Sequence, residues 1–272
     1  MTLVFLPSDG FGNLLFQHNA AYAFARERNL ELYALGWYYD ARPKFAEYHK
    51  LFKHVKILGN ISDCYPSQEF FQDPQSWRIN KAFTYFQGKV HLEPGHAYSP
   101  IPNDTRIMSG YFQSWKYFDK FRIEIRDLLR SNEIETWEAQ KSRFSGGICV
   151  HFRWGGDSLT NFSVQQPVLT KEYYIEAMKL FPDSKFLFFC EDPELVRDFA
   201  GPDVEIIEEP DPMKTLFLMS ICEHFIIANS TLSLMAYYMR ENEKARIVAP
   251  KNWFKHKPDY DINDVVKNAT FL

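Results

Sequence analysis

The sequence predicts an α/β protein built as two domains with a cleft between them. Short apolar runs alternate with segments whose apolar residues recur at helical spacing, which is typical of parallel sheets covered by helices on both faces. The alternation occurs twice, on either side of a polar and charged stretch at residues 131–145 that is the candidate linker. A chain of 272 residues is long enough for two domains. We therefore expect domains at residues 1–140 and 141–272.

In the first domain, apolar runs that end in turn residues predict strands, and apolar residues at helical spacing predict helices. Strands are expected at residues 3–6, 30–35 and 107–111, and helices at residues 14–28 and 117–130. Residues 36–102 are rich in Pro, Gly and aromatic side chains. This long stretch is expected to be irregular.

The second domain repeats the alternation. The run at residues 147–153 places Ile148, Val150 and Phe152 on one face, as a strand does. Further strands are expected at residues 185–190, 204–207, 225–228 and 246–249, and helices at residues 171–181, 194–199, 211–222 and 232–240. Because ligands of such sheets bind outside the carboxyl ends of the strands, the turns there are the first places to look for a site.

Composition excludes several classes of protein. The chain is 46% hydrophobic and 24% charged, which is ordinary for a globular protein and excludes disorder or a coiled coil as its main state. A net charge of -4 gives no basic surplus for nucleic acid. No run approaches the roughly 18 apolar residues of a membrane span, and residues 1–6 are too short for a signal peptide. The four cysteines lack CxxC spacing, so we expect a reduced, cytoplasmic protein.

Polar side chains that could carry chemistry follow the strands of the second domain. Arg153 offers a planar, bidentate cation next to Gly155 and Gly156, and Ser230 and Thr231 stand where a helix begins. Together they predict a diphosphate site. The other candidates at these strand ends are His151, Asp157, Asp192 and Asn229. Each has a structural alternative, such as a helix cap, a surface ion pair or a buried structural histidine.

The turn that opens the first helix carries a second set of candidates. Gly10 and Gly12 let a ligand approach the backbone closely, and Asp9, Asn13 and His18 place polar groups nearby. The pattern lacks the last glycine and the acidic partner of a dinucleotide fingerprint, which disfavours a dinucleotide-dependent oxidoreductase. A polar helix start is the structural alternative.

Six segments then point to one family. They are DGFGN at 9–13 with FQ at 16–17, GYFQS at 110–114, VHFR at 150–153, FCED at 189–192, IIANST at 226–231 and APKNWF at 249–254. In this order they resemble motifs of glycosyltransferase family 11, the α-1,2-fucosyltransferases. The resemblance implies a GT-B fold of two Rossmann-like domains, with the glycan acceptor on the first and the nucleotide sugar on the second. It also implies inverting transfer, most simply of L-fucose from GDP-fucose, with no metal and no further cofactor.

The resemblance also assigns roles to single residues. It carries diphosphate binding to Arg153 and places Asn13 on the cleft-facing asparagine of the first motif. Donor-side roles fall on His151, Asp192, Asn229, Ser230 and Thr231. An acceptor hydroxyl that attacks the opposite face of the sugar needs a base, and Asp9 and His18 are the nearest candidates.

Two departures from the family pattern lie beside the predicted diphosphate site. Trp154 stands where the family has a second arginine, and the added Gly156 displaces Asp157. Trp154 either offers a face on which a base or sugar stacks, or packs between the domains. The alternatives are therefore a different nucleotide-sugar donor, or a catalytically silent carbohydrate-binding protein. A metal-dependent transferase would use Asp259 and Asp261, although these lie in a polar tail.

Overall fold

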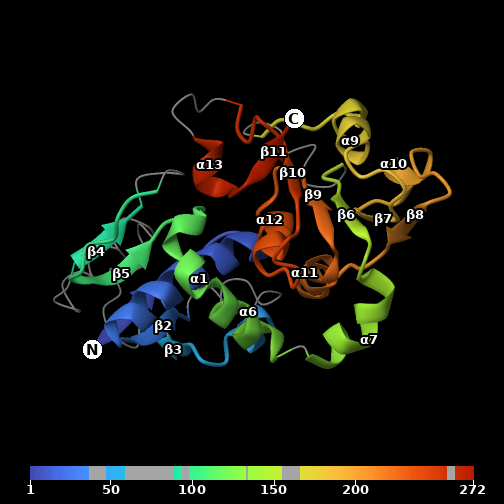
Figure 1. The fold of residues 1–272 in the computed structure, drawn as a ribbon. Coiled ribbons are helices and arrows are strands. Elements are labelled where there is room, and N and C mark those ends of the chain that lie inside the picture. Colours follow the sequence, from blue (N-terminus) through green and yellow to red (C-terminus); the bar gives the residue numbers. More distant parts are fainter. Residues whose placement is uncertain (37–46, 59–88, 94–97, 133, 155–165, 256–260) are drawn as a thin grey trace, which may run out of the picture. The chain divides into compact units, whose positions relative to one another are not determined.

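The computed structural model describes residues 1–36, 47–58, 89–93, 98–132, 134–154, 166–255 and 261–272. Over these residues the chain forms two compact units, Met1–Ile125 and Arg126–Leu272, each with its own parallel sheet (Figure 1). The division falls inside helix α6 (Arg122–Arg130). Asp157 and Asp259 lie outside the described residues.

The first unit contains a five-stranded sheet in the order β3-β2-β1-β5-β4, and neighbouring strands run parallel. The strands are β1 (Thr2–Phe5), β2 (Glu31–Leu35), β3 (Lys56–Leu58), β4 (Lys89–Leu92) and β5 (Thr105–Ser109). Helix α1 (Phe11–Arg28) connects β1 to β2, and short 3₁₀ segments lie at η1 (Glu47–Phe52), η3 (Trp115–Tyr117) and η4 (Asp119–Phe121). The predicted strands and the first helix are thereby confirmed within a few residues.

Helix α1 is buried over most of its length, including the polar side chains of Gln17, His18 and Asn19. Gly10 occupies its N-cap without a side-chain cap, and Asn29 ends it in the left-handed conformation with its N–H bonded to Ala25 O. A polar helix that is buried must satisfy these side chains within the protein. The hydrogen-bond partners of Gln17, His18 and Asn19 are therefore described below, with the turn at residues 8–13.

The second unit contains a six-stranded sheet in the order β11-β10-β9-β6-β7-β8, again parallel throughout the described strands. Its strands are β6 (Ile148–His151), β7 (Phe186–Phe189), β8 (Val204–Ile207), β9 (His224–Ile226), β10 (Ile247–Ala249) and β11 (Ala269–Phe271). Its helices are α7 (Ile134–Phe144), α9 (Lys171–Met178), α10 (Glu194–Arg197), α11 (Pro212–Ile221), α12 (Thr231–Tyr238) and α13 (Ile262–Val265). The strand order reverses direction at β6, so the topological switch point lies between β6 and β9.

Three expectations about secondary structure were wrong. The candidate linker at residues 131–145 contains helix α7, because Trp137 packs into the unit on one face while charged residues cover the other. The stretch 36–102, expected to be irregular, supplies η1, β3 and β4. The predicted helix at 117–130 consists of 3₁₀ turns followed by the shorter α6.

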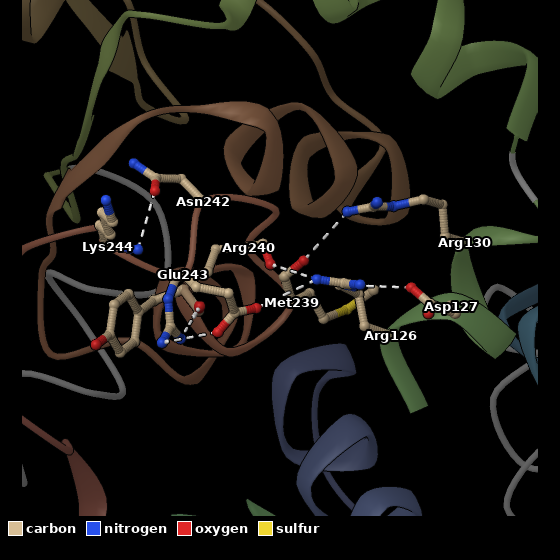
Figure 2. Close-up of polar contacts among 9 residues, drawn as sticks. Arg126, Asp127, Arg130, Met239, Arg240, Asn242, Glu243 and Lys244 are labelled. Carbon is tan, nitrogen blue, oxygen red and sulfur yellow. Dashed lines mark hydrogen bonds and ion pairs between the residues drawn. The ribbon is translucent and has the colours of Figure 1, made fainter. Parts of the chain in front are cut away.

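Two arginines of α6 bind the chain that follows α12 (Figure 2). The Nη1 group of Arg126 donates to Arg240 O at 3.3 Å and lies 3.3 Å from Glu243 Oε1, and Arg130 Nη2 donates to Met239 O at 3.4 Å. Positive charge at the C-terminus of a helix stabilises the helix dipole. The opposite end of α12, which begins after Ser230, lies at the carboxyl edge of the sheet.

No helix in the described part of the chain is both long and apolar enough to cross a membrane.

Candidate functional site

The carboxyl edge of the second sheet is hollowed by a cavity of about 680 Å³. The ends of three adjacent strands line it, with His151 as the last residue of β6, Cys190 and Glu191 after β7, and Glu208 and Glu209 after β8. The first turns of α11 and α12 supply further lining residues, among them Pro212, Thr215 and Leu232. Helix N-termini carry free backbone N–H groups and a partial positive charge. This edge therefore combines hydrogen-bond donors with carboxylates in one concave site.

His151 is held in one orientation at the wall of this cavity. Its side chain is 7% exposed, and its Nδ1 atom lies 2.9 Å from the Ser233 hydroxyl. That hydroxyl donates to Ser230 O at 3.3 Å, so it accepts from His151, which assigns the proton to Nδ1. Burial, with the nearby charge of Arg153, lowers the His151 pKa to about 3. The ring is thus neutral, and its Nε2 lone pair has no partner among the described residues.

Helix α9 fixes the ends of two strands through adjacent tyrosines. The Tyr174 hydroxyl donates to His151 O at 3.2 Å and is hydrogen-bonded to the backbone of Arg153. The Tyr173 hydroxyl donates to Ile227 O at 2.7 Å, two residues before Asn229. Neither tyrosine was predicted as part of the site. The pair positions the backbone from which the predicted donor-side residues project.

Trp154 packs within its own unit. Its indole N–H donates to Leu169 O at 2.8 Å, and its ring lies 5.0 Å from that of Phe152 and 5.3 Å from that of Tyr174. Arg153, which lies between Phe152 and Trp154 in the sequence, is half-buried. The departure from the family pattern at Trp154 therefore supports the backbone that carries Arg153.

The residues that open α12 are mostly engaged with the protein. Asn229 is 3% exposed and donates from Nδ2 to Pro167 O at 2.9 Å. Ser230 caps the helix, its hydroxyl accepting from Leu232 N at 3.3 Å, and Thr231 is half-buried in the first turn. Asp192 is exposed, and its Oδ1 accepts from Glu194 N at 3.1 Å at the start of the short helix α10.

The carboxyl edge of the first sheet gathers the second set of candidates. Asp9 has a left-handed backbone (φ 60°) and accepts a hydrogen bond from the Tyr111 hydroxyl. Burial, together with this hydrogen bond, raises the Tyr111 pKa to about 12. The Gln113 amide donates from Nε2 to Asn13 Oδ1 at 2.8 Å. Gln17, only 1% exposed, donates to Gly110 O at 3.0 Å. The strings at 9–13 and 110–114 thus meet in the fold, β1 and β5 being neighbours.

His18 lies behind this edge. It has no exposed surface, its Nδ1 lies 2.9 Å from Asn19 Oδ1, and its Nε2 lies 2.7 Å from His54 Nε2. The ring of Phe52 packs 4.3 Å away. Burial and the neighbouring His54 lower the His18 pKa well below its ordinary value. Both ring nitrogens therefore have protein partners in the interior of the unit.

Glu93 is a titratable group of the first unit that the sequence did not single out. It follows β4, and burial raises its pKa to about 7 against the opposing effect of hydrogen bonds from residues 111, 112 and 117. The signal that could have found it is a carboxylate after a short strand, but that strand was not predicted.

No cluster of three or more His, Cys, Asp or Glu side chains suited to a metal ion occurs among the described residues. Asp261, one member of the pattern at 259–261, caps α13 by accepting from Asn263 N at 2.9 Å.

The fold and this site define a class of protein. Two parallel α/β units, the second with a hollowed carboxyl edge at β6, β7 and β8, form the GT-B fold. The fucosyltransferase NodZ from Bradyrhizobium has a TM-score of 0.50 at 13% identity, over 88% of this chain and 94% of that one. The mutant FUT1 of Arabidopsis thaliana in complex with GDP also gives 0.50, at 12% identity, over 90% and 69%.

The chain belongs to glycosyl transferase family 11, whose model matches residues 93–268. An α-1,2-colitosyltransferase of Escherichia coli is 25% identical and covers 91% of both chains. The O-antigen biosynthesis glycosyltransferase WbnK of E. coli is 24% identical over 91% of this chain and 93% of its own. The predicted family and fold class are confirmed.

Proposed function

We propose that this glycosyltransferase moves L-fucose from GDP-fucose to a hydroxyl of a glycan acceptor, with inversion at the anomeric carbon. The observation that carries the proposal is the cavity at the carboxyl ends of β6, β7 and β8, which the first turns of two helices also line. Arg153 follows the lining residue His151 by two positions. The structure of FUT1 with GDP supports a guanosine diphosphate donor, and the name of the fucosyltransferase NodZ supports fucose as the sugar. A colitose donor is the second candidate, because one relative is named a colitosyltransferase.

The proposed mechanism follows from where charge develops. Cleavage of the sugar–phosphate bond leaves positive charge on the ring and added negative charge on the departing diphosphate. Arg153 offers the diphosphate a bidentate cation, and the first turn of α12 offers backbone N–H groups. Both are present before the reaction begins, so they stabilise the leaving group without reorganisation. In this proposal His151, Asn229, Ser230 and Thr231 bind the donor or shape its site.

Three further candidates take different places in the proposal. Trp154 supports Arg153, since its N–H and ring are occupied by its own unit. Asp192 holds the turn after β7 beside the donor. Asp157 stays a predicted donor contact outside the described residues.

We place the base that takes the acceptor proton at Asp9. Its carboxylate is half-buried beside the exposed Gly10, at the turn that opens α1. A general base must reach the proton that it removes. His18 lacks that access, because its side chain has no exposed surface and its Nε2 faces His54.

A donor screen tests the proposed function. Release of nucleoside diphosphate and formation of glycosylated product are measured with GDP-fucose, other GDP-sugars and UDP-sugars, with and without oligosaccharide acceptors. We expect turnover with a GDP-sugar and unchanged rates in excess EDTA, because a cation and helix N-termini neutralise the leaving group.

Two results of this screen contradict the proposal. Absence of nucleoside diphosphate release and of glycosylated product with every donor contradicts a transferase and favours a carbohydrate-binding protein. Loss of activity in EDTA that Mn²⁺ or Mg²⁺ restores identifies a metal-dependent transferase, and Asp259 and Asp261 become the first positions to mutate.

Gly10→Ala tests whether substrate approaches the backbone at the first turn. A Cβ at Gly10 meets no atom within 4 Å, and the backbone φ of -81° suits alanine, so stability should change little. If the acceptor lies against this turn, the added methyl group should raise its KM by about tenfold, the scale of an overpacked contact. Gly201→Ala is the matched control, since a Cβ there also meets nothing. If Gly10→Ala has the same acceptor KM as wild type, the acceptor does not bind against this turn.

A further inference from the structure

Glu93 and residues 110–113 meet at the carboxyl edge of the first sheet. Glu93 follows β4 directly, and residues 110–113 follow β5, the neighbouring strand. The Glu93 N–H donates to Ser109 O at 3.0 Å, which continues the pairing of the two strands to their ends. The Glu93 side chain is therefore placed against the backbone of the segment 110–113.

The carboxyl of Glu93 binds this segment through several donors. Phe112 N–H donates to Glu93 Oε2, and the backbone of Tyr111 also hydrogen-bonds the carboxyl. The Tyr117 hydroxyl is the third partner, and because its oxygen accepts from Ser99 N at 2.9 Å, its own hydrogen points to Glu93. These donors favour the ionised carboxylate, whereas Glu93 Oε1 is buried with no partner among the described residues, which opposes ionisation.

The backbone of the segment is shaped to fit Glu93. Gly110 has φ +146°, and a Cβ there would lie 2.5 Å from Glu93 Cβ, so only glycine allows this approach. Phe112 has φ 51°, a conformation that an L-residue rarely adopts without support. The hydrogen bond from Phe112 N–H to the carboxyl supplies that support.

The segment in turn sets the position of Asn13. Gln113 is 5% exposed, and its Nε2 donates to Asn13 Oδ1 at 2.8 Å. Its Oε1 is buried and has no partner among the described residues. Because Gln113 Oε1 is enclosed by the protein, the half-buried Asn13 is the amide that offers its Nδ2 donor to a sugar hydroxyl.

Two opposing effects set the pKa of Glu93. Burial opposes ionisation, while the donors at Tyr111, Phe112 and Tyr117 favour it, and the resulting pKa is about 7. Around these donors, Asp9 bonds Tyr111, Tyr98 lies beside Tyr117, and the ring of His91, whose pKa is lowered by burial, packs on Phe112. No Lys or Arg of the described chain forms an ion pair with Glu93.

We propose that Glu93 is a positioning residue of the acceptor side, whose carboxylate holds residues 110–113 in the conformation that joins Gln113 to Asn13. The inference rests on the proposed function for its link to the acceptor. Protonation of the Glu93 carboxylate weakens its hydrogen bonds from Tyr111, Phe112 and Tyr117. Phe112 then leaves its left-handed conformation. Binding of the acceptor hydroxyl then weakens, whereas the donor site in the other unit keeps its geometry.

The test compares wild type with Glu93→Gln, which keeps the size of the side chain and removes its charge. Glu47→Gln is the matched control, because Glu47 is an exposed carboxylate of the same unit that pairs with Lys50. Two quantities are measured between pH 6 and pH 8: the hydrogen-exchange protection of the Phe112 amide, and the acceptor KM and kcat with a saturating donor.

In wild type we expect Phe112 protection to fall and the acceptor KM to rise by about tenfold as the pH drops from 8 to 6, the scale of one charged hydrogen bond. Glu93→Gln should show the low protection and high KM at every pH, with the donor KM and donor hydrolysis unchanged. The proposal is overturned if Glu93→Gln shows the same Phe112 amide protection as wild type, or the same pH dependence of the acceptor KM. If wild type turns over no donor, the proposed function fails, and the Phe112 measurement alone decides whether Glu93 holds the segment.

Discussion

Arg153→Ala is expected to lower sugar transfer by about 10²–10³-fold, the usual loss when one preorganised stabiliser of transition-state charge is removed. The loss should fall mainly on kcat, because the diphosphate gains negative charge only as its bond to the sugar breaks. Stability should change little, since Arg153 is half-buried at a strand end and its backbone is fixed by Tyr174. Steady-state kinetics and thermal unfolding measure the two effects.

Two further variants define what the guanidinium supplies. Arg153→Lys keeps one charge but loses the planar fork, so it should recover only a small part of the activity. Arg197→Ala is the control, because Arg197 is an exposed arginine of the same unit whose ion-pair partner is Glu194. Near wild-type turnover in Arg153→Ala would exclude Arg153 from diphosphate binding.

The second large effect expected is a loss of stability in acid. His151 is buried and neutral, with a pKa lowered to about 3 by burial and by Arg153. In the unfolded chain its pKa returns to about 6.5, so below that pH the unfolded state binds a proton that the folded state refuses. The free energy of unfolding is therefore unaffected by His151 protonation above pH 6.5, and it falls as the pH drops from 6.5 toward 3. By pH 4 the loss should reach about 3 kcal/mol.

Chemical denaturation between pH 7 and pH 4 measures this dependence. His151→Gln keeps a donor for Ser233 and should flatten the pH dependence of the second unit. The first unit should keep its own dependence, because burial also lowers the pKa of His18 and brings that of His54 to about 4. A His151→Gln profile as steep as that of wild type would show that His151 is charged in the folded protein.

The α/β alternation was predictable because it depends on local pattern. The strand at 204–207 was located to the residue, and the turns after β6, β7 and β9 were correctly placed at strand ends. Parallel topology then brings those turns to one edge without further information. The fold class therefore followed from the spacing of apolar residues and from the family motifs together.

What could not be predicted depends on contacts across the chain. Strands β3 and β4 have only three and four residues with lysine at the first position, so they lack a recognisable period. Glu93 was missed with β4. The polarity of residues 131–145 indicated a linker, yet Trp137 anchors a helix there. Likewise, nothing local shows that Tyr173 and Tyr174 each reach a different strand end.

The neutral state of His151 makes part of the cavity of the second unit a region of hydrogen-bond acceptors. An imidazole lone pair at Nε2 repels phosphate oxygens, and so do the nearby carboxylates of Glu191, Glu208 and Glu209. The same groups attract the N–H and O–H groups of a base or ribose. In the proposed complex with a nucleotide sugar, the orientation with the base or ribose toward these groups is therefore favoured over the reverse. Selection between the two orientations thus begins in the electrostatic potential, before any close contact has formed.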